Sequence, residues 1–287
     1  MLPIPTYQAA PVATVVAPAQ SRPQAAHSAT QALRRHWPEY CIEAWALGMF
    51  MASACTFGVL LEHPGSVLRQ IIGSTLERNA IAGLAMGLTA IFLIYSPWGK
   101  RSGAHMNPAV TLSFLRLGKI RGWDTLFYIG SQFAGGAAGV VVAATLFGGR
   151  LAHPAVNYVV TTPGPAGRAV AFAAELLISG VLMSTVLNVT ALPQLERYTG
   201  VFAGALVAIY ITFEAPLSGM SMNPARTFAS AIVARQWTAF WLYLAAPLAG
   251  MLLAAEFHRL RKAPTACAKY QHTSTQRCIF CGANGGF

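Results

Sequence analysis

A ten-residue segment occurs twice in this chain. Ser102-Gly-Ala-His-Met-Asn-Pro-Ala-Val-Thr111 returns as Ser218-Gly-Met-Ser-Met-Asn-Pro-Ala-Arg-Thr227, with seven of ten positions identical at an offset of 116 residues. Asn is a favoured helix N-cap and Pro is favoured at the first helical position, so Asn107-Pro108 and Asn223-Pro224 each predict the start of a helix. The chain is therefore expected to consist of two similar halves.

Six long stretches without any charged residue surround the two copies. A helix needs about 20 mainly apolar residues to cross about 30 Å of hydrocarbon. Only 10% of the chain is charged, against about 25% in soluble domains. We therefore predict an all-α integral membrane protein with six spans, the fifth of them short. The stretches are Ala44–Leu61, Asn79–Trp98, Thr125–Gly149, Leu176–Leu195, Tyr198–Phe213 and Gln236–Ala255. Glycine pairs four residues apart, Gly135/Gly139 and Gly200/Gly204, predict close helix packing inside the spans.

Basic residues indicate the orientation in the membrane. With six spans both termini lie on one side, and that side holds 14 of the 20 Lys and Arg residues. Loops kept in the cytoplasm accumulate these residues, so both termini are expected to be cytoplasmic, in a plasma (inner) membrane. The net charge of +11 reflects this pattern. Because the chain has no basic stripe with interleaved aromatic residues, no nucleic-acid partner is expected.

The repeated segments are too short to cross the membrane. About ten helical residues at about 1.5 Å each span about 15 Å, half of the hydrocarbon thickness. Each half has three spans, so the halves have opposite orientations and the two short helices enter from opposite faces. Their N-termini, each with roughly half a positive charge, would face one point and repel cations. The amides of Asn107 and Asn223 could hold a passing water oxygen there.

These features resemble the aquaporin (major intrinsic protein) family over residues 39–258. The resemblance is carried by Asn107-Pro108-Ala109 and Asn223-Pro224-Ala225, by Arg226 after the second motif only, and by the Ser-Gly pairs before both motifs. It implies that the two Asn residues are central donors and that Arg226 belongs to an outer selectivity constriction. Glu43 and Glu175 resemble the acids that brace the two re-entrant loops, and Gln132 also matches a family position. A homotetramer with one pore per subunit is implied as well.

The other constriction positions depart from the common family pattern. Motif spacing places Met86, Ile211 and Met220 there, whereas a typical water-selective member has an aromatic residue at the first place and His at the second. Thr227 stands where the glycerol-conducting branch usually has Asp. We therefore expect a passive channel for water and other small neutral solutes that excludes protons and ions. The alternatives are a channel mainly for glycerol-like or other small uncharged solutes, and a secondary transporter with an inverted repeat.

The sequence divides into five expected parts. They are a disordered cytoplasmic tail over 1–38, a first channel half over 39–147 with a re-entrant helix at 107–117, an extracellular connecting loop over 148–167, a second half over 168–258 with a re-entrant helix at 223–234, and a cytoplasmic tail over 259–287 that contains Cys and His. A signalling role is disfavoured because the last tail is short.

Several polar residues leave alternatives open. Glu43 and Glu175 could form a proton relay instead of a brace. His105 could sense pH or act as a hydrogen-bonded loop histidine. Transport itself is expected to need no cofactor, and the absence of a catalytic grouping argues against an enzyme. In the last tail, Cys267, His272, Cys278 and Cys281 have the spacing C-x4-H-x5-C-x2-C of a structural zinc site, with redox-active or unreactive thiols as alternatives.

Overall fold

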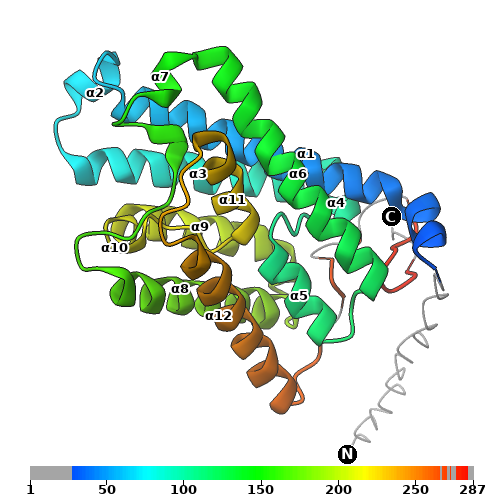
Figure 1. Ribbon diagram of the computed structural model, residues 1–287. Coiled ribbons are helices and arrows are strands. Elements are labelled where there is room, and N and C mark those ends of the chain that lie inside the picture. Colours follow the sequence, from blue (N-terminus) through cyan, green and yellow to red (C-terminus); the bar gives the residue numbers. More distant parts are fainter. Residues whose placement is uncertain (1–27, 266, 270–271, 273–275, 284–287) are drawn as a thin grey trace, which may run out of the picture.

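All regular structure in the described part of the chain is helical (Figure 1). The computed structural model describes residues 28–265, 267–269, 272 and 276–283. Its long helices are α1 (Ala29–Glu62), α3 (Thr75–Tyr95), α6 (Gly122–Phe147), α8 (Arg168–Thr190), α9 (Thr199–Phe213) and α12 (Phe240–Leu260). The shorter elements are α2 (Val67–Ile71), α4 (Pro97–Ser102), α5 (Pro108–Arg116), α7 (Gly149–Ala152), α10 (Ala215–Ser218), α11 (Pro224–Ala234), and the 3-10 turns η1 (Asn157–Val159) and η2 (Glu196–Tyr198).

The long helices fit a lipid environment. By length and composition, α1, α3, α6, α8 and α12 can each cross a membrane, whereas α9, with 15 residues, is shorter than a typical span. A short fifth span was expected from the sequence. Large apolar side chains on the outside of the bundle, such as Phe92, Leu146, Leu177, Phe213 and Leu253, are more than half exposed. Such surfaces are rare on soluble monomers and suit contact with lipid.

The two halves pack in the same way. α1 lies along α6 in the first half, α8 lies along α12 in the second, and α3 against α9 joins the halves. Glycine makes these contacts close: an added Cβ on Gly135 would lie 2.0 Å from the Ala44 carbonyl oxygen, and one on Gly139 would lie 2.1 Å from a carbonyl oxygen of α1. Gly204 approaches α3 in the same manner. The predicted packing through small residues is confirmed.

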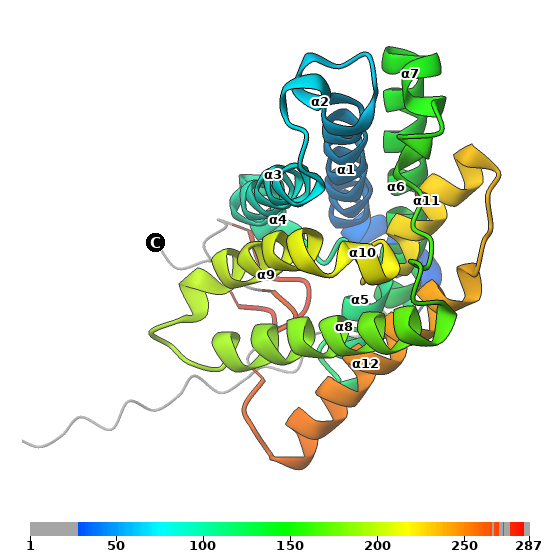
Figure 2. The ribbon, with the colours of Figure 1, turned by 90° about the vertical axis from the view of Figure 1, so that its left-hand side faces the viewer.

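The short helices α5 and α11 tie the halves together. Each packs against the third long helix of the opposite half, α5 against α12 and α11 against α6. Figure 2 views the bundle from the end that carries α2, α7 and α10, whereas the start of α1 and the tail after α12 lie at the other end (Figure 1). The start of the chain's first helix and its last described residues therefore share one end of the bundle.

The first helix begins earlier than the sequence predicted. α1 starts at Ala29, so residues 29–38 belong to a helix and not to a disordered tail; residues 1–27 lie outside the described part. The Ser28 side chain caps the helix by accepting from the backbone N–H of Gln31 at 3.2 Å. Asp124 of α6 then fixes the first turns, with Oδ1 2.7 Å from His36 Nδ1 and 2.6 Å from the Tyr40 hydroxyl. These anchors are far away in sequence, which is why local composition did not reveal them.

Candidate functional site

The N-termini of the two short helices are joined by a pair of reciprocal hydrogen bonds. The side-chain amide of Asn107 donates to the Met222 carbonyl oxygen at 2.7 Å. The amide of Asn223 donates to the Met106 carbonyl oxygen, also at 2.7 Å. Each amide carries two hydrogens and uses one in this bond. The second hydrogen of each amide is therefore available to another acceptor.

The same two side chains cap the helices that they precede. Asn107 Oδ1 accepts from the Ala109 N–H at 2.9 Å. Asn223 Oδ1 accepts from the N–H groups of Ala225 and Arg226 at 3.0 and 3.2 Å. Each following proline occupies the first helical position. The backbone N–H at this position has no acceptor within the helix, so proline, which lacks it, loses no hydrogen bond there. The predicted helix starts are confirmed, with bounds of Pro108–Arg116 for α5 and Pro224–Ala234 for α11.

Two fully buried carboxylates hold the loops that lead into these helices. Glu43 Oε1 accepts from the Ser102 hydroxyl at 2.8 Å and from the His105 N–H at 3.0 Å. Its Oε2 accepts from the Met106 N–H at 2.7 Å and from the Gln132 amide at 2.9 Å. Four donors thus surround one carboxylate, which compensates for the removal of its charge from water.

Glu175 makes the equivalent contacts in the second half. Its Oε1 accepts from the Ser218 hydroxyl and the Ser221 N–H at 2.8 and 2.7 Å, and its Oε2 accepts from the Met222 N–H at 2.7 Å. The loops that the two acids hold contain residues in the left-handed region, where side chains other than glycine are strained. These are Gly103, Ala104, Met106, Gly219, Met220 and Met222, with φ between 48° and 96°.

Two tyrosines support the same loops and were not found by sequence reasoning. The Tyr128 hydroxyl donates to the Ser102 carbonyl oxygen at 2.8 Å, and the Tyr243 hydroxyl donates to the Ser218 carbonyl oxygen at 2.5 Å. Both rings are fully buried. The two tyrosines lie 115 residues apart, close to the motif offset, so a comparison of the third spans of the two halves would have revealed them.

A cavity of about 240 Å³ passes the meeting point of the two short helices. Its wall includes both Asn107 and Asn223. The four residues predicted for the constriction, Met86, Ile211, Met220 and Arg226, also line it. Most of the remaining wall is aliphatic or aromatic. The structure thus brings the predicted donors and the predicted constriction residues to one cavity.

The guanidinium of Arg226 is fixed by a loop between the halves. Its Nη1 donates to the Val159 carbonyl oxygen at 2.8 Å. Val159 is β-branched and has a φ of 51°, an uncommon conformation for such a residue. The strained turn η1 therefore positions the Arg226 guanidinium through the Val159 carbonyl oxygen. Among the described residues that line the cavity, Arg226 is the only Lys or Arg.

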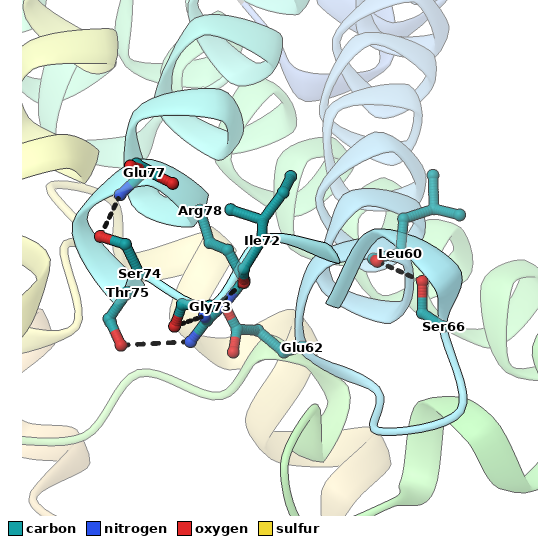
Figure 3. Close-up of polar contacts among 9 residues, drawn as sticks. All are labelled: Leu60, Glu62, Ser66, Ile72, Gly73, Ser74, Thr75, Glu77 and Arg78. Carbon is teal, nitrogen blue, oxygen red and sulfur yellow. Dashed lines mark hydrogen bonds and ion pairs between the residues drawn. The ribbon is translucent and has the colours of Figure 1, made fainter. Parts of the chain in front are cut away.

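A second arginine closes the loop at the end of α1 (Figure 3). Arg78 is buried; its Nε donates to Glu62 Oε1 at 3.0 Å, and its Nη1 donates to the carbonyl oxygens of Ile72 and Gly73 at 3.0 and 2.8 Å. Glu62 lines the cavity. This arrangement fixes the loop over residues 63–74 beside one end of the cavity, and nothing in the motif pattern pointed to it.

His105 lines the cavity where the loop into α5 meets the tail after α12, and both of its ring nitrogens have partners. Its Nε2 is 2.7 Å from the Ala268 carbonyl oxygen, and its Nδ1 is 3.1 Å from Thr111 Oγ1. A carbonyl can only accept, so Nε2 carries a proton in this bond and Nδ1 can accept from the threonine. This geometry matches the hydrogen-bonded loop histidine among the two roles considered from sequence.

Four residues of the last tail form a compact cluster. The ligand atoms of Cys267, His272, Cys278 and Cys281 all lie within 4.8 Å of one another, so the cluster could hold a metal ion. The sulfurs of Cys267 and Cys278 are 3.7 Å apart, far beyond the roughly 2.05 Å of a disulfide. Tetrahedral zinc with Zn–S bonds of about 2.3 Å places two sulfurs about 3.8 Å apart. Mutual hydrogen bonds with Cys278 and Cys281 raise the pKa of His272 to about 9.

Comparisons with known proteins agree with this architecture. Residues 28–258 match the family model described as Major intrinsic protein. The chain is 36% identical to aquaporin NIP1-3 of Oryza sativa subsp. japonica over 179 residues, which are 62% of this chain and 60% of that protein. It is 31% identical to probable aquaporin NIP4-2 of Arabidopsis thaliana over 201 residues, 68% of each. The chain spans about 60% of the length of the rice relative and of several others.

A solved structure supports the fold. The X-ray structure of the aquaglyceroporin from Plasmodium falciparum superposes with a TM-score of 0.64 at 20% identity, covering 78% of this chain and 95% of that one. The expected all-α inverted-repeat fold is confirmed. Because the family model covers residues 28–258 of 287, this chain belongs to the major intrinsic protein family and is an integral membrane protein.

Proposed function

We propose that the chain is a passive channel for water and other small neutral solutes that excludes protons and ions. The observation that carries this proposal is the meeting of α5 and α11, N-terminus to N-terminus, at a cavity lined by Asn107 and Asn223. Each helix end contributes roughly half a positive charge, and each Asn has one amide hydrogen left to donate. A neutral molecule with an oxygen acceptor is accommodated there, whereas a cation is repelled.

The constriction residues favour a broader solute range than water alone. Met86, Ile211 and Met220 contribute apolar side chains to the same cavity wall as Arg226. A water molecule in that position would find donors on one side only, whereas a small solute with carbon atoms would also contact the apolar wall. Methionine is flexible, so the wall can adapt to solutes of different shapes. Water is the first permeant proposed, and glycerol-like solutes are the second.

A secondary transporter is the rival within the same architecture. Ion coupling needs ionisable groups that are free to exchange an ion. Glu43 and Glu175 each accept hydrogen bonds on both carboxylate oxygens from their own loop. This arrangement supports the bracing role and gives no reason to assign either acid to a proton relay.

Assembly, orientation and metal content complete the proposal. The chain forms a homotetramer with one pore per subunit in a plasma (inner) membrane, with both termini cytoplasmic. Residues 39–147 and 168–258 form the two channel halves, joined by an extracellular loop. The metal held by the tail cluster is zinc, because three thiols and one imidazole at tetrahedral spacing suit that ion.

The proposal is tested in proteoliposomes by stopped-flow light scattering. Water, glycerol, urea and ammonia are compared, with zinc present and with a membrane-permeant zinc chelator. We expect faster water flux than in protein-free vesicles in at least one of the two conditions, independent of any ion gradient. Uptake that requires a sodium or proton gradient would favour the transporter instead.

A further inference from the structure

The tail after α12 covers one residue of the cavity wall, His105. His105 lines the cavity, and its Nε2 donates to the Ala268 carbonyl oxygen at 2.7 Å. The Phe280 ring lies parallel to the His105 ring, with centroids 5.8 Å apart and planes 6° apart. Two separate parts of the tail thus contact one side chain of the cavity wall.

The tail is buried against the channel body. Ala268 is fully buried, and Cys267 and Phe280 belong to the same apolar cluster as Val110 and Phe114 of α5. An added Cβ on Gly103, which has a φ of 96°, would lie 3.0 Å from the Ala268 carbonyl oxygen. The loop that leads into α5 is therefore packed closely against the tail.

The tail that packs against the channel body contains little regular secondary structure. Beyond Leu260, the described part of the tail has no helix or strand. A turn at Cys278 is closed by backbone bonds from Gly282 N–H to the Cys278 carbonyl oxygen and from Cys278 N–H to the Ala283 carbonyl oxygen, both 2.9 Å. Segments this small usually need a metal or other crosslink to hold one conformation. The Cys/His cluster would supply that crosslink from inside the docked tail.

We propose that zinc bound by Cys267, His272, Cys278 and Cys281 folds the tail into a plug that closes the cavity at His105, so that loss of zinc opens the channel. The inference rests on the proposed channel function and the proposed zinc site. Zinc that binds the docked tail better than the undocked tail must, by linkage, favour docking. The ion binds only to the tail. The docked tail then contacts His105 through Ala268 and Phe280.

The zinc site is tested first on the full-length channel in detergent. Metal analysis is expected to find one zinc ion per chain, because four ligands complete one tetrahedral site. The double variant Cys278→Ser/Cys281→Ser should lose the ion. The matched control Cys41→Ser replaces an exposed thiol of α1 outside the cluster and should keep it. A wild-type channel that neither contains zinc nor binds added zinc would overturn the proposal.

Docking is measured without reference to flux. Lys269 is buried, so zinc should protect the peptide bond after it from trypsin, and the chelator should expose it. In proteoliposomes, the chelator should raise water permeability several-fold in wild type and in Cys41→Ser. It should have no effect on the double variant, which is already open.

Phe280→Ala separates metal binding from plugging, because Phe280 is not a ligand. This variant should retain one zinc ion and yet conduct faster than wild type with zinc bound. Equal wild-type flux with and without zinc, or slower flux after chelation, would overturn the plug. If no sample conducts while zinc still protects Lys269, the proposed channel function fails and tail docking stands.

Discussion

Glu43 and Glu175 occupy equivalent positions in the two halves of the channel. Each carboxylate accepts one serine hydroxyl and two backbone N–H groups from the loop that leads into the short helix of its own half. Both side chains are fully buried. The strained loops on either side of the cavity are therefore held by the same hydrogen-bonded arrangement, used twice.

Replacing either acid by Gln should loosen its loop. In Glu175→Gln, the new NH₂ group would replace one carboxylate oxygen, and both of these oxygens now accept a hydrogen bond from a backbone N–H. A buried donor left without a partner costs about 1–3 kcal/mol. We expect a lower thermal unfolding temperature in detergent and reduced permeability. The control Glu77→Gln changes an exposed acid on α3 and should alter neither. A variant of Glu175 as stable as wild type would contradict the brace.

Arg226→Val should weaken the exclusion of cations and widen the range of solutes. The substitution removes a positive charge from the cavity wall and breaks the bond to the Val159 carbonyl oxygen. Proteoliposomes loaded with a proton-sensitive dye would report the leak, and light scattering would report the solutes. Arg150→Val, at an exposed position on α7, is the matched control. Unchanged proton leak and solute range in a folded Arg226 variant would refute the assignment.

Arg78→Leu should release the loop over residues 63–74. The change leaves the carbonyl oxygens of Ile72 and Gly73 without their donor and Glu62 without its ion pair (Figure 3). These acceptors are half-exposed or exposed, so water can replace part of the lost contact, and each lost hydrogen bond costs about 0.5–1.5 kcal/mol. Limited proteolysis should cut this loop faster than in wild type. Arg150→Leu, at an exposed position on α7 outside this loop, serves as control, and equal cleavage rates for the two variants would count against the anchoring role.

Stability should fall as pH rises through about 7 because of Glu214. This residue lies in the turn between α9 and α10, and burial raises its pKa to about 7, with the nearby Glu175 carboxylate adding to the rise. Because the pKa of this carboxyl is higher in the folded state than in the unfolded state, its protonation stabilises the fold. This stabilisation is fully present below the unfolded-state pKa and is lost as the pH rises through the folded-state pKa.

The test compares unfolding temperatures across that range. Glu214→Gln should remove the decline between about pH 5 and about pH 8. Glu196→Gln, at an exposed position in η2, should retain it. An identical pH profile for wild type and Glu214→Gln would exclude this carboxyl as the cause.

Local signals were sufficient to predict the helices of the site. Asn107 and Asn223 each precede a proline, and this pair alone specifies a capped helix start. The uncharged stretches predicted the long helices, and the glycine pairs predicted their close packing. What local signals could not provide were contacts across the chain. The start of α1 depends on Asp124, and the loop after it depends on Arg78, which no motif marks.

The tail shows the same limit. The spacing of Cys267, His272, Cys278 and Cys281 indicated a metal cluster, and the structure brings their ligand atoms together. The position of that cluster against His105 depends on Ala268 and Phe280, whose partners lie more than 150 residues earlier. Neither residue carries a signal of its own. Such docking is visible only once the channel halves have been assembled.

Simultaneous measurement of water and proton flux in the same proteoliposomes tests the central claim most directly. With the zinc chelator present, the opposed ends of α5 and α11 should allow water to pass faster than through protein-free vesicles, while the proton flux stays at the protein-free level. Proton flux that rises together with water flux, or water flux no faster than through bare lipid, would contradict the account.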